Sequence, residues 1–300
     1  MTQQRQHPQQ QTNELNISLV WHNLRYEASH WLHHREKVPI LRCLTGSLEY
    51  HNLTGFMGPS GCGKTTFIRC LTGNMVVRSG LSSETEIYLN PVEKRKPIIG
   101  LIDRAVHEMI YGQLKVGEAL RYAFLFKNRC ISKHQMNEHI ERIIEELMLD
   151  KKILKRRFNL CSGGEQKRIA IAQELMSLRR QPSFLFVDEP TTGLDSNSAL
   201  VVMKCLRRLA DNHRMSVTIS IHTPNSDILH LFDKLYVLAK GGVCIYAGPP
   251  DQLRPLLKEQ FGLDSSCDDH QEDELEKPPI EEYLKIACMG KFVNEMKKFN

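Results

Sequence analysis

Long apolar runs are missing from this sequence. No stretch of about 18 consecutive apolar residues, the length that a membrane-spanning helix needs, occurs in the chain. The first dozen residues are mostly glutamine and lack the apolar core of a signal peptide. We therefore expect the chain as given to be soluble. Residues 1–15 are expected to form a disordered, Gln-rich tail, because they bury too little surface to offset their ordering entropy.

Cysteine pairs with the Cys-x-x-Cys spacing are also missing. The nine cysteines are an odd number, and they are scattered through segments that have the apolar character of a core. This usage argues against a zinc site and favours reduced thiols in a cytosolic setting.

A strong excess of one charge is absent as well, since the net charge is only +5 on 300 residues. The densest basic run, residues 151–157, could contact anionic lipid or nucleic acid, but a solvated helix end is the simpler interpretation. We expect no nucleic-acid partner. Because 41% of the residues are hydrophobic, the chain can bury a substantial core, which favours one globular unit with an added subdomain.

A glycine-rich loop is the most informative feature that is present. The pattern Gly-x-x-x-x-Gly-Lys-Thr predicts a loop whose backbone N–H groups surround the phosphates of a nucleoside triphosphate. We expect residues 53–57 to form the strand that enters the loop and residues 67–71 to lie on the helix that leaves it. The residues expected to bind the nucleotide are Gly58, Pro59, Ser60, Gly61, Cys62, Gly63, Lys64, Thr65 and Thr66.

Two adjacent carboxylates follow a second apolar run. Residues 184–187 have the pattern of a buried strand, and this strand ends in Asp188 and Glu189. The pair could simply terminate a strand, but two carboxylates are costly there unless a positive charge lies beside them. Magnesium supplies that charge, so Asp188 suits a magnesium shell and Glu189 suits an attacking water.

A serine and two glycines, Ser162, Gly163 and Gly164, precede an amphipathic helix. At a helix start they make a second candidate anion site. Alone, the triplet would be an ordinary turn. Its position between the glycine-rich loop and the paired carboxylates favours a functional role.

The order of these motifs resembles that of the ATP-binding cassette (ABC) family. Gly193, Leu194 and Asp195 follow the carboxylates, and His222 follows a strand expected at residues 217–221. The resemblance covers about residues 16–262. It implies an α/β fold, a P-loop NTPase cassette with a mixed β-sheet core, an antiparallel β subdomain and a helical subdomain at about residues 106–160.

The resemblance also implies roles for single residues. Lys64 and the loop amides would hold the phosphates of ATP, while Thr65 and Asp188 would hold Mg²⁺. Glu189 would polarise the attacking water, and His222 would contact the γ-phosphate.

Two further roles follow from the same resemblance. Tyr26 resembles the aromatic residue that stacks on adenine, although a strand-end tyrosine packed on the core is the alternative. Ser162, Gly163, Gly164 and Asp195 belong to the nucleotide-binding set, and the first three would close on the ATP of an opposite subunit. Both sites would therefore need a dimer.

Residues 191–196, 222–228 and 246–250 resemble the G, or white, subfamily. Its members are mostly half-transporters that pair as homodimers or heterodimers and move lipids, sterols, pigment precursors or xenobiotics. The likeness implies a transmembrane domain that is absent from this chain, with residues 263–300 as a linker toward it. It also implies a position at the cytoplasmic face of a cellular membrane and ATP hydrolysis that powers export.

One residue of the family pattern is missing. The family places a glutamine after the strand that precedes the helical subdomain, whereas here residues 98–102 are followed by Asp103 and Arg104. A guanidinium has no acceptor atom and cannot ligate magnesium. The alternative function is therefore a regulatory nucleotide-binding partner with weak or no hydrolysis. A soluble ABC protein of translation or DNA repair is less favoured, because the chain has one cassette and no sustained heptads.

Local patterns give four more expectations. Residues 17–26 alternate as an edge strand does, and residues 240–242 have the composition of a hairpin turn. Ser132 with Gln135 fits a capping box, and residues 196–212 fit an amphipathic helix.

Overall fold

The computed structural model describes residues 17–29, 37–73, 80–90, 99–102, 110–129, 131–253 and 255. The elements follow one another along the chain as β1 (Ile17–Ser29), β2 (Lys37–Glu49), β3 (Leu53–Met57), α1 (Lys64–Leu71), β4 (Glu86–Leu89), β5 (Ile99–Ile102), α4 (Val116–Lys127), α5 (Lys133–Glu146), the 3-10 helices η1 (Lys151–Lys155) and η2 (Phe158–Leu160), α6 (Gly163–Glu174), β6 (Phe184–Asp188), α7 (Ser196–Asn212), β7 (Ser216–Ile221), α8 (Ser226–Leu229), β8 (Lys234–Ala239) and β9 (Val243–Gly248).

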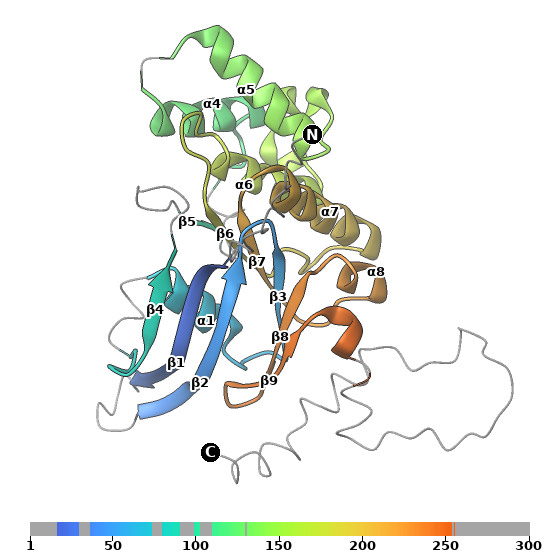
Figure 1. The fold of residues 1–300 in the computed structure, drawn as a ribbon. Coiled ribbons are helices and arrows are strands. Elements are labelled where there is room, and N and C mark those ends of the chain that lie inside the picture. The colour runs from blue at the N-terminus through green and yellow to red at the C-terminus, as the bar shows by residue number, and fades with distance from the viewer. Residues whose placement is uncertain are drawn as a thin grey trace, which may run out of the picture.

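A six-stranded sheet forms the centre of the molecule (Figure 1), with the order β5-β6-β7-β3-β8-β9. Its first five strands pair in parallel, and β9 is antiparallel to β8. Strands β3, β6 and β7 are buried along their whole length, as expected for parallel strands covered on both faces. The prediction of an α/β fold with a mixed sheet is confirmed, and so is the hairpin between β8 and β9.

A second, antiparallel sheet has the order β2-β1-β4. Here one expectation was wrong, because β1 lies between β2 and β4 rather than at an edge. In β1, Leu19 and Trp21 alternate onto a buried face, and Leu24 is also buried beyond an irregularity in the pairing with β2. An interior strand of an antiparallel sheet shows that same alternation, so the pattern alone could not exclude a second neighbour.

Two apolar clusters hold these layers together. The larger one joins the helices α4 to α8 to one face of the central sheet. The smaller one fills the space between the two sheets and α1, where the ring centroids of Phe56 and Tyr236 are 4.9 Å apart and those of Trp21 and Phe67 are 5.2 Å apart. Helix α1 is therefore fixed against both sheets, which positions the loop that precedes it.

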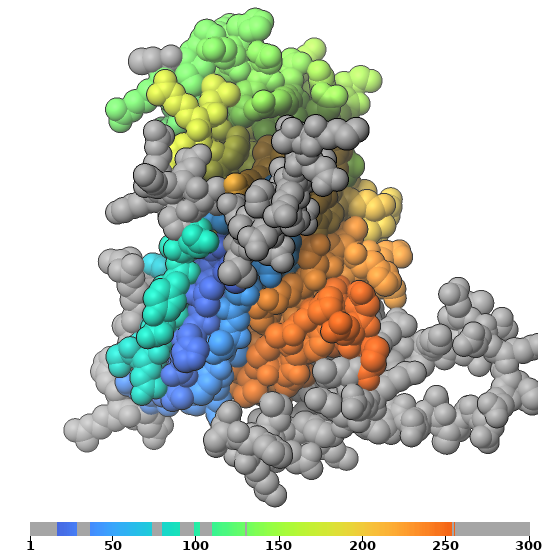
Figure 2. Space-filling model, viewed as in Figure 1, coloured from blue at the N-terminus to red at the C-terminus, as the bar shows by residue number. Residues whose placement is uncertain are grey.

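Helices α4 and α5 form one end of the molecule, and the antiparallel sheet lies toward the other end (Figures 1 and 2). The expected capping box starts α5, since Ser132 Oγ accepts the Gln135 N–H at 3.3 Å. The predicted helical subdomain overlaps this end, but residues 103–109 lie outside the described residues, as do the predicted tail at 1–15 and the predicted linker at 263–300. Among the helices of the described residues, none has the length and apolarity needed to cross a bilayer.

Candidate nucleotide-binding site

The glycine-rich loop lies between β3 and α1, at the carboxyl end of the parallel strands. Gly58 has φ 150°, and a Cβ there would stand 2.3 Å from the Leu238 carbonyl oxygen. Gly63, with φ 105°, caps the N-terminus of α1, and a Cβ there would stand 2.6 Å from Leu41 Cδ2. Only glycine fits both places, so the loop backbone can approach a ligand closely. The helix N-terminus faces the loop, where its partial positive charge favours phosphate.

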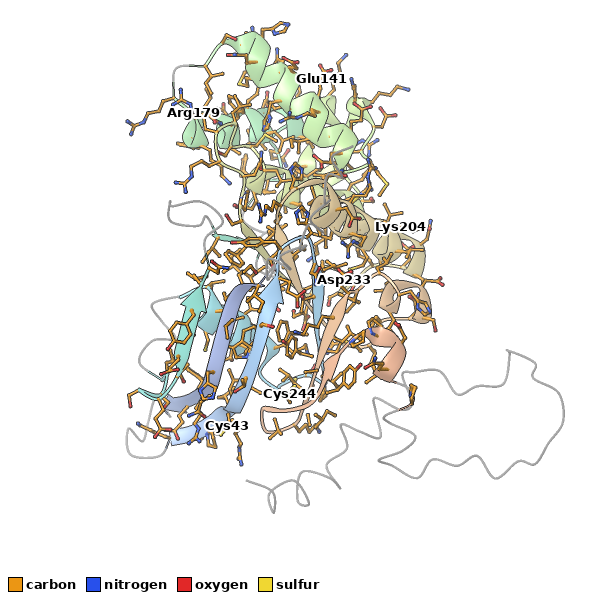
Figure 3. The ribbon with its side chains drawn as sticks, in the orientation of Figure 1. Cys43, Glu141, Arg179, Lys204, Asp233 and Cys244 are labelled. Carbon is orange, nitrogen blue, oxygen red and sulfur yellow. The ribbon has the colours of Figure 1, made fainter. Side chains whose placement is uncertain are left out.

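Asp233 fixes the opposite end of β3. Figure 3 labels Asp233. Its Oδ2 accepts the N–H of Leu53 at 2.7 Å, and the guanidinium of Arg207 on α7 binds the same carboxylate. The strand that carries the loop is therefore held at its first residue as well as through its neighbours β7 and β8.

Lys64 is 5% exposed and lies over the loop. Its Nζ donates to the carbonyl oxygens of Gly58 at 2.7 Å and Pro59 at 3.1 Å, and it lies 3.4 Å from His222 Nδ1. A buried ammonium next to a ring of backbone N–H groups is suited to bind the phosphates of a nucleotide.

Thr65 and Asp188 come together from different elements. Thr65 Oγ1 donates a hydrogen bond to Asp188 Oδ2 at 2.8 Å. Two oxygen atoms of the kind that bind magnesium thus lie beside the glycine-rich loop. Magnesium usually binds through one or two such oxygens together with phosphates of its substrate. The described residues contain no group of three or more His, Cys, Asp or Glu side chains that could hold a metal without such help. The residues present thus fit a magnesium ion that is bound jointly with a nucleotide.

Glu189 has a backbone φ of 48°, in the left-handed region that non-glycine residues rarely adopt. Its Oε1 lies 2.7 Å from His222 Nε2, and its Oε2 accepts from Thr192 Oγ1 at 3.1 Å. These contacts bring the carboxylate, the histidine and Lys64 to one side of the loop. The arrangement can orient a water molecule beside a terminal phosphate.

A cavity of about 350 Å³ opens at this edge of the sheet. Its lining residues come from the loop, from β2 and from the carboxylate pair, namely Ile40, Ser60, Gly61, Gly63, Lys64, Thr65, Thr66 and Glu189. The sequence motifs from distant parts of the chain therefore meet around one space. That space adjoins the N-terminus of α1.

Comparison with known proteins agrees with this geometry. The family model for the ABC transporter matches residues 41–192. The chain belongs to the ABC transporter family. Among its curated relatives, ABC transporter G family member 28 of Arabidopsis thaliana is 34% identical over 227 residues, which cover 70% of this cassette and 19% of that protein. The resemblance to the G, or white, subfamily is thereby confirmed.

The cassette spans only part of the curated relatives that it matches. The covered share is 16% of ABC transporter G family member 43 and 34% of member 21, both of Arabidopsis thaliana.

Solved structures show that the fold is that of an ABC cassette. CbiO1 of Clostridium perfringens, part of the ABC transporter complex CbiONQ, superposes with a TM-score of 0.66 at 18% identity and covers 81% of this chain and 94% of its own. The ATP-binding cassette MJ0796, a dimer in a post-hydrolysis state bound to ADP and Pi, gives a TM-score of 0.59 at 20% identity, with 77% and 98% covered. The prediction of a P-loop ABC cassette fold is confirmed.

Ser162, Gly163 and Gly164, called the signature residues from here on, are not among the residues that line the cavity. Ser162 caps α6, and its N–H donates to Glu165 Oε2 at 2.7 Å. A Cβ on Gly164 would contact Ser198 at 3.3 Å, which shows that the start of α6 packs on the start of α7.

Asp195 caps α7. Its side chain accepts the Ser198 N–H at 2.9 Å, and hydrogen bonding by Ser198 holds the pKa of Asp195 below its ordinary value. The signature and Asp195 thus adjoin each other on one surface rather than meeting the loop.

Tyr26 and Ile40, both on the antiparallel sheet, differ in their relation to the cavity. Tyr26 pairs with Leu81, its ring lies against Gly80, and it does not line the cavity. The stacking role of Tyr26 stays a prediction. Ile40 on β2 lines the cavity instead, and no pattern in the sequence singled it out. An apolar residue on an alternating strand carries no signal of its contacts with a loop far along the chain.

Proposed function

We propose that this ABC cassette binds ATP with Mg²⁺ and hydrolyses it to power transport through a membrane domain. The observation that supports the proposal is the convergence of Lys64, Asp188, Glu189 and His222 at the glycine-rich loop. Magnesium, when bound, would supply positive charge beside the β- and γ-phosphates.

Each residue would have one task. Lys64 and the loop amides would hold the phosphates, while Thr65 and Asp188 would provide oxygen ligands to the metal. Glu189 would orient and polarise the attacking water, and His222 would contact the γ-phosphate. The chemistry would then consist of positioning and charge stabilisation.

A second cassette would complete the site. Ser162, Gly163, Gly164 and Asp195 adjoin one another outside the cavity, so they could contact the ATP of a partner in either a homodimer or a heterodimer. ATP would then join the two cassettes, and hydrolysis would release them. The curated relatives are transporters of the G family, which supports a position at the cytoplasmic face of a membrane.

A regulatory subunit with weak or no hydrolysis is the second candidate. It rests on Arg104, which replaces the glutamine of the family pattern and lies outside the described residues. A guanidinium can donate to phosphate or pair with a carboxylate, but it cannot ligate magnesium.

Two variants test the function. Glu189→Gln should lower kcat by roughly 10²–10⁴-fold, because an amide cannot act as a base, and it should leave ATP binding intact. Equal turnover in this variant and in the wild type would remove the assigned role.

Arg104→Gln separates the two candidates: a large gain in ATPase rate supports the weakly hydrolysing subunit, and an unchanged rate supports the active ATPase. Phosphate release measured with and without Mg²⁺ gives both results.

A further inference from the structure

Three hydroxyl side chains share one face of β7. Ser216, Thr218 and Ser220 alternate with apolar residues along this strand, and all three are buried to within 1% exposure. The hydroxyls of Ser216 and Thr218 have no hydrogen-bond partner in the part of the chain that the structure describes. Ser220, at the carboxyl end of the strand, contacts both residues of the carboxylate pair.

The Ser220 hydroxyl uses its donor and an acceptor position at the same time. Its Oγ donates to Asp188 Oδ1, and it accepts the backbone N–H of Glu189 at 2.9 Å. The carbonyl oxygen of Ser220 also lies 3.2 Å from that N–H. Since Thr65 donates to the other oxygen, Oδ2, two hydroxyls fix the orientation of the Asp188 carboxylate.

The hydrogen bond from the Glu189 N–H to Ser220 helps to hold the backbone of Glu189 in an unusual conformation. Residue 189 has φ 48°, a conformation that costs free energy and persists only where its surroundings hold it. Ser220 Oγ accepts the N–H of Glu189, while Thr192 and His222 contact the carboxylate of Glu189. These contacts stabilise the strained conformation.

We propose that Ser220 is a positioning residue that sets the orientation of both Asp188 and Glu189. The inference rests on the proposed function, because it concerns magnesium-dependent binding and hydrolysis at the same site. Ser220 is fully buried and is not among the residues that line the cavity, so it would act through its two neighbours. Without its hydroxyl, the carboxylate of Asp188 keeps the hydrogen bond from Thr65 but loses the one at Oδ1, and the backbone N–H of Glu189 loses a buried acceptor.

The test compares Ser220→Ala with matched variants of the same strand. Ser216→Ala and Thr218→Val remove equally buried hydroxyls that have no partner among the described residues, so they control for the loss of a polar group from β7. Ser220→Thr keeps the hydroxyl, and Ser220→Cys fills the same place with a slightly larger group that is a weaker donor. The 300-residue chain is titrated with a fluorescent ATP analogue, with and without Mg²⁺, and its ATPase kinetics are measured.

For Ser220→Ala we expect the gain in ATP affinity on adding Mg²⁺ to fall by about tenfold, with unchanged affinity in EDTA. We expect kcat to fall by about 10–100-fold while KM changes less than about threefold, because misplacement of a reacting group mainly affects kcat. Ser220→Thr should restore both values, and the two control variants should match the wild type.

The outcomes separate this inference from the proposed function. If the wild type gains affinity with Mg²⁺ and Ser220→Ala gains as much, Ser220 has no positioning role even though the site is functional. If Ser220→Ala does not fold, Ser220→Cys decides, and an unreduced magnesium effect in that variant overturns the inference. A wild type that binds no ATP with Mg²⁺ overturns the proposed function and this inference together.

Discussion

Glu189 illustrates how single residues in this cassette depend on their neighbours. Its left-handed backbone costs roughly 1–2 kcal/mol for a residue other than glycine. Hydrogen bonds from Thr192 and to Ser220 offset that cost, and the result directs the carboxylate toward His222. A glycine at this position would relieve the strain and remove the functional group.

The burial of Cys62 predicts that its thiol reacts slowly. The thiol lies inside the phosphate loop at 1% exposure, and burial raises the pKa of Cys62, an effect that the Lys64 ammonium offsets only in part. Only the thiolate reacts with alkylating agents, and a raised pKa keeps the thiol protonated to higher pH. We therefore predict that iodoacetamide at pH 8 modifies the exposed Cys43 much faster than Cys62.

Peptide mass spectrometry of the folded chain measures both rates, and the chain in denaturant is the control in which both thiols should react. Equal rates in the folded chain would contradict the burial of Cys62.

The turn between β8 and β9 packs on β2, the strand that contributes Ile40 to the cavity. A Cβ on Gly242 would stand 1.8 Å from the Ile40 carbonyl oxygen, and Arg42 N–H donates to the Gly242 oxygen at 2.9 Å. Gly241 also has a positive φ, 91°, but its Cβ would meet nothing within 4 Å. The two glycines therefore share the backbone cost of a substitution and differ in the clash.

We predict that Gly242→Ala destabilises the chain by about 2 kcal/mol more than Gly241→Ala, which is the matched control. Because the clash moves Ile40, ATP affinity should also fall in Gly242→Ala. Urea unfolding and nucleotide titration measure the two effects. Equal stability of the two variants would show that the turn does not pack on β2 in solution.

Local elements were predictable where the signal is local. The phosphate loop with its flanking strand and helix, the cap at Ser132 and the helix that starts after Asp195 all follow from residues close together in the chain. The position of β1, and the contacts of Ile40 and Ser220, depend on pairing between segments far apart. A strand pattern specifies which face is buried but not which strands lie beside it.

The site itself was predictable to the extent that it is made of motifs. Lys64, Thr65, Asp188, Glu189 and His222 were expected together, and they do lie together. Ser220 carried no signal, because a serine in an apolar strand is ordinary until its partners are known.

The whole molecule presents two surfaces that the proposed mechanism needs together. One surface is the cavity, which the glycine-rich loop lines. The other is at the starts of α6 and α7, where Ser162 and Asp195 lie. Ser132 provides a control, because it caps α5 with the same hydrogen-bond pattern as Ser162 but lies in the helical end.

We predict that a Glu189→Gln chain with MgATP forms a dimer, in which Ser162 of one copy contacts the ATP of the other. Adding Ser162→Arg should abolish the dimer by placing a bulky cation at that contact, and adding Ser132→Arg should not. Light scattering measures the mass, and nucleotide titration confirms that both variants still bind ATP. A dimer that survives Ser162→Arg would exclude the signature from the interface.

The ion pair between Arg207 and Asp233 has a mechanical consequence. Helix α7 begins next to Asp195, and Arg207 lies roughly 17 Å farther along its axis, in the last third of the helix. Asp233 binds both that guanidinium and the first amide of β3. In the proposed dimer, a second cassette would contact the start of α7. A rigid tilt of α7 would then displace the first residue of β3, the strand that ends at the glycine-rich loop. Closure of the dimer would in this way be coupled to the affinity for nucleotide.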